Sequence, residues 1–210
     1  MSTGRLRDMD VRLALRAHLS GVHAGDDDTL IIEELALSHG HARIDVAVLN
    51  GTFSGYEIKS ESDTLVRLPR QQAAYSAVFD AVTIVVGGNH AEAVSREVPT
   101  WWGITCVFVN DAHDVEMREI RPAEPNPGVD VLALVQLLWR DEALAILADH
   151  DADDGMARQP RRAVWQRVTE VLDAEELRLV VRQQLKGRGY WRSASPPMSR
   201  GGSSRAVAKS

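Results

Sequence analysis

A predicted β-hairpin around Asn50-Gly51 constrains the fold of this chain more than any other feature. Residues 42–49, "ARIDVAVL", and residues 56–60, "YEIKS", both have the composition of strands. An Asn-Gly pair between two such runs is a strong hairpin signal. We therefore predict antiparallel strands at 42–49 and 56–60, with the rest of the sheet built around them.

The hairpin brings charged side chains together. Side chains in a strand alternate between the two faces of the sheet, so Glu57 and Lys59 share one face. One register of the hairpin places Asp45 on the same side as Glu57 and Lys59. The apolar residues of the first strand are expected on the face opposite Asp45: Ile44, Val46 and Val48.

Two carboxylates and one ammonium at one place suggest a specific chemistry. Carboxylates held close together repel, and one becomes neutral unless a cation joins them. Mg²⁺ would balance both charges and accepts oxygen ligands. A bound Mg²⁺ can polarise a phosphoryl oxygen and activate water, and Lys59 could orient that water. The pattern suits phosphodiester hydrolysis; the alternative is a structural salt-bridge network at a sheet edge.

The rest of the chain predicts a mixed sheet covered by helices. Further strands are expected at 30–37, 82–86 and 104–109, and helices at 5–19, 69–79 and 91–97. The Pro-rich stretch 121–128 is a candidate linker. Beyond it we predict helices at 130–148, 160–172 and 174–185, the last capped by Asp173. The resulting division is a core over 1–125, a helical extension over 126–190 and a disordered basic tail over 191–210.

Composition excludes several classes of protein. The net charge of −6 is not that of a polycation for nucleic acid, although residues from Gln183 onward are basic and contain no Asp or Glu. The single Cys106 excludes a disulfide framework and a multi-cysteine zinc site. There is neither an apolar run of about 18 residues nor an apolar core near the start. We expect a cytoplasmic protein with no membrane partner.

The motif residues resemble a known family. Asp45 followed by Glu57-Ile58-Lys59 resembles the PD-(D/E)XK nuclease superfamily, with Ile44 in place of the usual proline. Gln71 and Tyr75, one helical turn apart, resemble the Gln-x-x-x-Tyr element of its recombination-exonuclease branch. The stretches "GYEIKSESDTLVRLPRQQAAYSAVFD", "VPTWWGI" and "LLWRDEAL" resemble a small bacterial family of uncharacterised members, the "sce"-type proteins.

This resemblance implies an α/β fold with a restriction-endonuclease-like mixed central sheet, flanked by helices, and a C-terminal helical extension. It implies a Mg²⁺ or Mn²⁺ ion held by Asp45, Glu57 and the main-chain carbonyl of Ile58, with help from Glu34 or its neighbour Glu33.

The remaining residues have implied roles in turnover and binding. Lys59 would serve the nucleophile, and Gln71 and Tyr75 would position the substrate or the lysine. Arg67 and Arg70 are candidates for phosphate contacts. The alternative for these arginines is an ordinary solvated surface charge, and for Gln71 and Tyr75 it is helix packing.

The sequence therefore favours a metal-dependent nuclease, with DNA ahead of RNA as the substrate. The competing hypothesis is a catalytically silent nucleic-acid-binding or adaptor module with the same fold, suggested by the helical C-terminal part and the basic tail. The C-terminal helices are expected to form a substrate wall or a homodimer surface.

Overall fold

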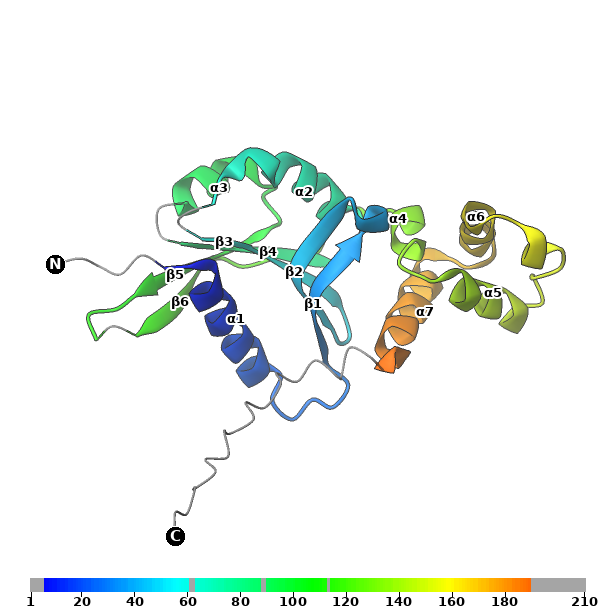
Figure 1. The fold of residues 1–210 in the computed structure, drawn as a ribbon, viewed down its shortest axis with the longest axis horizontal. Coiled ribbons are helices and arrows are strands. Elements are labelled where there is room, and N and C mark those ends of the chain that lie inside the picture. The colour runs from blue at the N-terminus through cyan, green and yellow to red at the C-terminus, as the bar shows by residue number, and fades with distance from the viewer. Residues whose placement is uncertain (1–5, 61–62, 88–89, 113, 190–210) are drawn as a thin grey trace, which may run out of the picture.

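A six-stranded mixed sheet forms the centre of the protein (Figure 1). The computed structural model describes residues 6–60, 63–87, 90–112 and 114–189. The spatial order is β1-β2-β3-β4-β5-β6, with β3, β4 and β5 parallel and the other neighbours antiparallel. The strands are β1 (Leu30–Leu37), β2 (Ala42–Leu49), β3 (Phe53–Lys59), β4 (Ala81–Gly87), β5 (Gly103–Val109) and β6 (Val115–Arg121).

Helices cover both faces of the sheet. In Figure 1, α1 lies on one face, and α2 and α3 lie on the other. Both crossover helices are expected on one face, because parallel crossovers are right-handed and β3, β4 and β5 follow one another across the sheet. The α-helices are α1 (Asp8–Val22), α2 (Leu68–Ser76), α3 (Ala91–Glu97), α4 (Val131–Val135), α5 (Arg140–Asp149), α6 (Arg161–Val171) and α7 (Ala174–Gly187). The described residues also form the short 3₁₀ turns η1 (Ser38–Gly40), η2 (Leu65–Arg67) and η3 (Met156–Arg158).

Two hydrophobic clusters hold these layers together. Val11, Leu15 and Leu19 recur every four residues along α1, and they pack with Val46 and Val85 on one face of the sheet. The larger cluster fills the other face and continues into the C-terminal helices. The C-terminal helices and the sheet therefore share one core.

The Pro-rich connection is hydrogen-bonded to the core. The side-chain amide of Asn126 donates to the carbonyls of Ser76 at 2.7 Å and Phe79 at 2.8 Å. The main-chain N–H of Asp130 donates to the carbonyl of Ala77 at 2.9 Å. This segment consequently fixes the start of α4 beside the end of α2.

The structure confirms the predicted α/β architecture and corrects several details. The strands predicted at 30–37 and 42–49 have the bounds of β1 and β2, and Asp173 caps α7 through the N–H groups of Glu175 and Glu176. The single helix predicted over 130–148 is wrong: α4 ends, and α5 begins after Trp139, whose N–H donates to Glu142. Strand β6 was not predicted, and the predicted tail at 191–210 lies outside the described residues.

Strand β1 is kinked at Glu34. This residue has a left-handed φ of 58°, which costs a non-glycine residue about 1–3 kcal/mol and persists only where the surrounding structure compensates for it. Ile32 before the kink and Leu35 after it pack in the same hydrophobic cluster. The alternation of faces therefore shifts by one residue at Glu34.

The predicted alternation along β2 is wrong at its start. Ile44 was expected on the face of Val46 and Val48, but it packs in the cluster under α2, whereas the two valines pack with α1. The change of face along β2 falls at Asp45. This residue lies opposite Glu34, between the pairs Glu33–Val46 and Leu35–Ile44. Asp45 thus sits where the regular pleat is interrupted.

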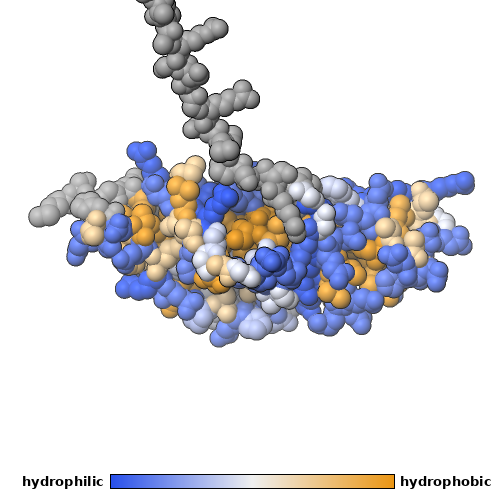
Figure 2. All heavy atoms as spheres, turned by 90° about the horizontal axis from the view of Figure 1, so that it is seen from below, coloured by the Kyte–Doolittle hydropathy of each residue, from blue (hydrophilic) through white to orange (hydrophobic). Residues whose placement is uncertain are grey.

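One face of the molecule can be examined for exposed apolar side chains in Figure 2. On the face in Figure 2, apolar residues form separate patches among hydrophilic ones. No helix in the described ranges is both long and apolar enough to cross a bilayer. The large apolar side chains that are exposed come from several elements: Met9, Leu13, Val22, Val66, Val115, Ile120, Trp139 and Leu179.

Gly103 is predicted to be essential for packing at the start of β5. A Cβ there would lie 2.8 Å from Thr83 Oγ1 and 2.9 Å from the main-chain nitrogen of Ala123, which cannot rotate away. We expect Gly103→Ala to lower the free energy of unfolding by about 1–3 kcal/mol in urea denaturation. Gly51→Ala is the control, since nothing lies within 4 Å of a Cβ there. Equal stability of the two variants would contradict this account.

Candidate functional site

The site forms where β2 and β3 separate. Their pairing runs from Leu49 and Phe53 to Val46 and Tyr56. Beyond the Val46–Tyr56 pair, Asp45 Oδ2 accepts a hydrogen bond from the main-chain N–H of Ile58 at 2.8 Å. The carboxylate thus takes the place of a main-chain acceptor at the end of the ladder.

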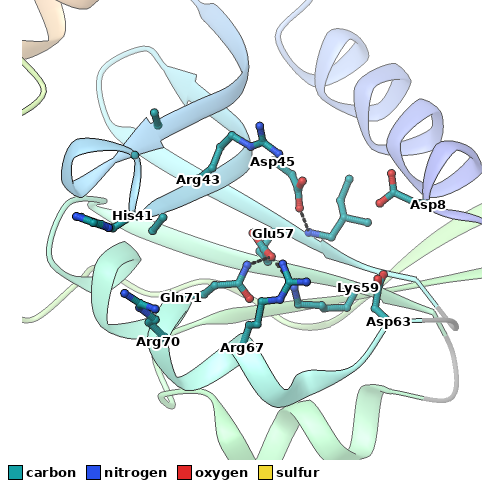
Figure 3. A pocket seen from close by; sticks show the side chains of 14 residues that line it. Asp8, His41, Arg43, Asp45, Glu57, Lys59, Asp63, Arg67, Arg70 and Gln71 are labelled. Carbon is teal, nitrogen blue, oxygen red and sulfur yellow. Dashed lines mark hydrogen bonds and ion pairs between the residues drawn. The ribbon is translucent and has the colours of Figure 1, made fainter.

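A cavity of about 610 Å³ opens beside this point (Figure 3). Figure 3 shows Glu57 near the centre, His41 and Arg70 towards one side, and Asp8 and Asp63 towards the other. The wall therefore has a basic side and an acidic side. The lining residues are Asp8, Ala36, Gly40, His41, Ala42, Arg43, Asp45, Glu57, Ile58, Lys59, Asp63, Arg67, Arg70 and Gln71.

Glu57 is the deepest charged group of the site. Its side chain is only 3% exposed. Its Oε1 accepts from Lys59 Nζ at 2.6 Å and from Gln71 Nε2 at 2.5 Å, and its Oε2 lies 2.7 Å from the hydroxyl of Tyr75. The direct contact between the two side chains confirms the predicted sharing of a face by Glu57 and Lys59, and both are buried.

The surroundings favour the protonated form of Glu57. Burial, followed by the charge of Asp45, raises the pKa of Glu57 to about 7, although Lys59 acts in the opposite direction. The Tyr75 hydroxyl also lies 2.7 Å from the main-chain oxygen of Arg43. A hydroxyl has one proton to donate, so both short contacts of Tyr75 are satisfied together when Glu57 carries a proton.

Tyr75 lies behind Glu57 and not on the pocket wall. Its side chain is fully buried, stacked on Trp102 with ring centroids 6.2 Å apart and edge-on to Phe79. Burial and the neighbouring charge of Glu57 raise the pKa of Tyr75. Tyr75 therefore positions Glu57 and does not reach a ligand in the cavity.

Gln71 connects Tyr75 to the cavity. Its Nε2 donates to Glu57 and also lies 3.2 Å from the Tyr75 hydroxyl. Its Oε1 is buried and has no hydrogen-bond partner among the described residues. A buried acceptor without a partner costs free energy, so this oxygen is suited to accept a hydrogen bond from a molecule in the cavity.

Asp45 is paired with an arginine from α1. Arg12 NH2 lies 2.8 Å from Asp45 Oδ1, and the Asp45 side chain remains 20% exposed. Arg12 also contacts Glu34 at 3.0 Å and Asp8 at 3.5 Å. Burial acts to lower the pKa of Arg12, but the hydrogen bond to Asp45 and the three carboxylate charges outweigh it, and the pKa is raised.

The two candidates for the upstream acidic residue separate clearly. Glu34 contacts Arg12 and is 2.5 Å from Arg43 Nε, so it joins the network around Asp45. Glu33 pairs instead with Arg16, one turn further along α1, at 3.0 Å. Of the two, Glu34 is the one linked to the site, and it is linked through arginines.

Arg67 and Arg70 line the cavity and are exposed. Among the described residues neither forms an ion pair, which leaves both charges open to a ligand. Sequence reasoning missed four charged residues of the site: Asp8, Arg12, Arg43 and Asp63. Arg43 and Asp63 lie within four residues of motif positions, but no pattern in the sequence indicates that α1 reaches Asp45.

The acidic residues do not by themselves form a preformed cage for a metal ion. Within the described ranges, no group of three or more His, Cys, Asp or Glu side chains is arranged to hold one. Asp45 and Glu57 are the carboxylates that line the cavity next to Ile58, and Glu34 is held by arginines. An ion held by Asp45 and Glu57 would need its other ligands from the main chain or water.

Comparison with known proteins places the chain in a family. The family model described as "Bacteriophage P4 protein cII" matches residues 1–200. The chain belongs to the bacteriophage P4 protein cII family. Protein cII of Enterobacteria phage P4 is 34% identical over 99 residues, which are 47% of this chain and 37% of that relative. The match thus covers well under half of the relative's length.

A solved structure is also similar, at a low level. It is a protein of unknown function from Silicibacter pomeroyi, 24% identical, with a TM-score of 0.38 over 72% of this chain and 93% of that one. The resemblance to the PD-(D/E)XK superfamily stays a prediction.

The raised pKa of Glu57 predicts a fall in stability with pH. Between pH 4.5 and about 7 an unfolded chain ionises Glu57 while the folded chain retains the proton, so raising the pH favours unfolding. The difference corresponds to on the order of 3 kcal/mol. Urea titrations at pH 5 and pH 8, without divalent ions, should show this fall for the wild type and much less of it for Glu57→Gln. The exposed Glu92→Gln is the control, and an unchanged fall in Glu57→Gln would refute the assignment.

Proposed function

We propose that this cII-family chain is a metal-dependent phosphodiesterase that acts on nucleic acid, with DNA ahead of RNA as the substrate. The observation that carries the proposal is the meeting of Asp45 and buried Glu57 in a cavity with arginines along one side. Carboxylates supply metal ligands and arginines attract phosphates, so the two features together suit a phosphodiester.

The donor set fits a divalent cation. After burial, the charge of Asp45 is the main cause of the raised pKa of Glu57, and a divalent cation relieves that repulsion. Asp45, Glu57 and the main-chain carbonyl of Ile58 would hold Mg²⁺ or Mn²⁺. Two carboxylates are sufficient because Mg²⁺ usually keeps several waters.

The chain's own residues have separate tasks. A bound divalent cation polarises a phosphoryl oxygen and lowers the pKa of a bound water. Lys59, held 2.6 Å from Glu57, would stabilise charge that develops on the phosphate or orient the attacking water. Gln71 Oε1 would accept a hydrogen bond from that water, and Tyr75 keeps Glu57 in place.

One observation favours the second candidate, a catalytically silent nucleic-acid-binding module. Both carboxylates proposed as metal ligands already have a protein cation: Asp45 has Arg12, and Glu57 has Lys59. A network of this kind is also what a purely structural role would produce. Cleavage assays separate the two candidates, because they differ in turnover and not in binding.

Metal binding is predicted to depend on Asp45 and Glu57. Calorimetry with Mn²⁺ should give binding to the wild type and a loss of at least about tenfold in affinity for Asp45→Asn and for Glu57→Gln, since each removes a charged ligand. Glu33→Gln, which alters only an exposed pair with Arg16, should bind like the wild type. Circular dichroism checks that each variant is folded.

Cleavage tests the proposed activity directly. The full chain with Mg²⁺ or Mn²⁺ should cleave single-stranded or double-stranded DNA, and Lys59→Met should reduce the rate by at least about 100-fold, the effect typical of losing a group that stabilises transition-state charge. If the wild type binds DNA but cleaves neither DNA nor RNA with either metal, the silent binding module is the better description.

Arg67 and Arg70 are predicted to contact phosphates. Replacing both by Gln should weaken DNA binding and reduce the salt dependence of log Kd by up to about two phosphate equivalents, measured by fluorescence anisotropy between 50 and 200 mM salt, roughly the range over which such contacts are screened. Arg96→Gln, at an exposed α3 position paired with Glu92, is the control. An unchanged salt slope in the double variant would place the DNA elsewhere.

A further inference from the structure

The guanidinium of Arg12 is surrounded by carboxylates. Its Nε faces Asp8 at 3.5 Å, its NH1 faces Glu34 at 3.0 Å and its NH2 faces Asp45 at 2.8 Å. Each nitrogen thus meets a different acidic residue, and these residues come from α1, β1 and β2. The Arg12 side chain is 17% exposed, so most of it is out of solvent.

This arrangement differs from an ordinary surface ion pair. Arg16 on the next turn of α1 makes a single contact with Glu33, and its side chain is 48% exposed. Arg12 instead compensates several negative charges at a place where Glu34 is held in a left-handed conformation. The Arg12 guanidinium is surrounded by carboxylate oxygens in the way that a bound metal cation would be.

Charge balance explains why this matters for Asp45. With Arg12 in place, Asp45 Oδ1 has a cationic partner and Oδ2 has the N–H of Ile58. A divalent ion at Asp45 would then lie next to the positive guanidinium of Arg12. Two neighbouring positive charges repel strongly in a partly buried site. Without Arg12, the ion pair between Glu34 and Arg43 would be the one left to Asp8, Glu34 and Asp45 within the described ranges.

We propose that Arg12 is a tethered cation that competes with a divalent metal ion for Asp45. The inference rests on the proposed function, because it takes Asp45 to be a metal ligand. Arg12 holds Asp45 and Glu34 in place while the site carries no metal, and it lowers the metal affinity of the site. Metal binding then requires the guanidinium to leave Asp45 Oδ1, which couples the position of this α1 side chain to occupancy of the site.

Arg12→Gln tests the competition. A neighbouring unit charge changes the proton affinity of a carboxylate by about 10- to 1000-fold, and we expect Arg12→Gln to bind Mn²⁺ about tenfold more tightly than the wild type in calorimetry. Arg12→Lys keeps the positive charge and should stay close to the wild type. Arg16→Gln, one turn away, should have no effect. In the absence of metal, Arg12→Gln should melt at a lower temperature, because the carboxylates lose their shared partner.

The outcomes separate this inference from the proposed function. Wild-type binding with equal or weaker binding by folded Arg12→Gln overturns the competition and leaves the metal site intact. Binding by Arg12→Gln alone supports the competition and shows that Arg12 blocks the site in the wild type. Absence of binding in both folded proteins overturns the metal site and the competition together. If Arg12→Gln is not folded, tighter binding by Arg12→Lys than by the wild type overturns the competition, and binding within about twofold supports it.

Discussion

The hydrogen bond from Ile58 N–H to Asp45 is the interaction on which the geometry of the site depends. It ends the β2–β3 ladder with a side chain instead of a main-chain carbonyl, so the strands can separate without leaving a buried donor unpaired. The kink at Glu34 in the adjacent strand accompanies this separation. The cavity therefore lies where the pairing of β2 with β3 ends, and the Asp45 side chain replaces the main-chain acceptor that Ile58 would otherwise lack.

A buried network on the other side of the break keeps Glu57 in one position. Lys59, Gln71 and Tyr75 all contact its carboxylate, and Tyr75 is itself fixed by stacking on Trp102. Such networks are rigid when all members are satisfied and costly when they are not. Within the described part of the chain, Gln71 Oε1 is the atom of this network that lacks a partner, and Gln71 lines the cavity.

Local sequence patterns were sufficient to predict part of this structure. The hairpin at Asn50-Gly51 and the shared face of Glu57 and Lys59 follow from short-range turn and alternation rules, which is why they were predicted correctly. The face of Ile44 could not be predicted, since it depends on the kink in a neighbouring strand. Arg12 is 33 residues away from Asp45, and only the packing of α1 on the sheet brings them together. Strand β6 is an edge strand rich in charged residues. Charged residues protect an edge from pairing with another chain, and they obscure the alternation of apolar and polar residues by which a strand is recognised in a sequence.

Asp45 and Glu57 each have a cation from the protein itself. Arg12 serves Asp45 from a helix, and Lys59 serves Glu57 from the same strand. A buried or partly buried carboxylate without a partner would be strongly destabilising, so these cations allow the chain to fold before any ligand is present. In the proposed metal site, an external cation has to compete with Arg12 for Asp45. Under this proposal, Arg12 therefore raises the stability of the metal-free protein and lowers the metal affinity of Asp45 through the same ion pair.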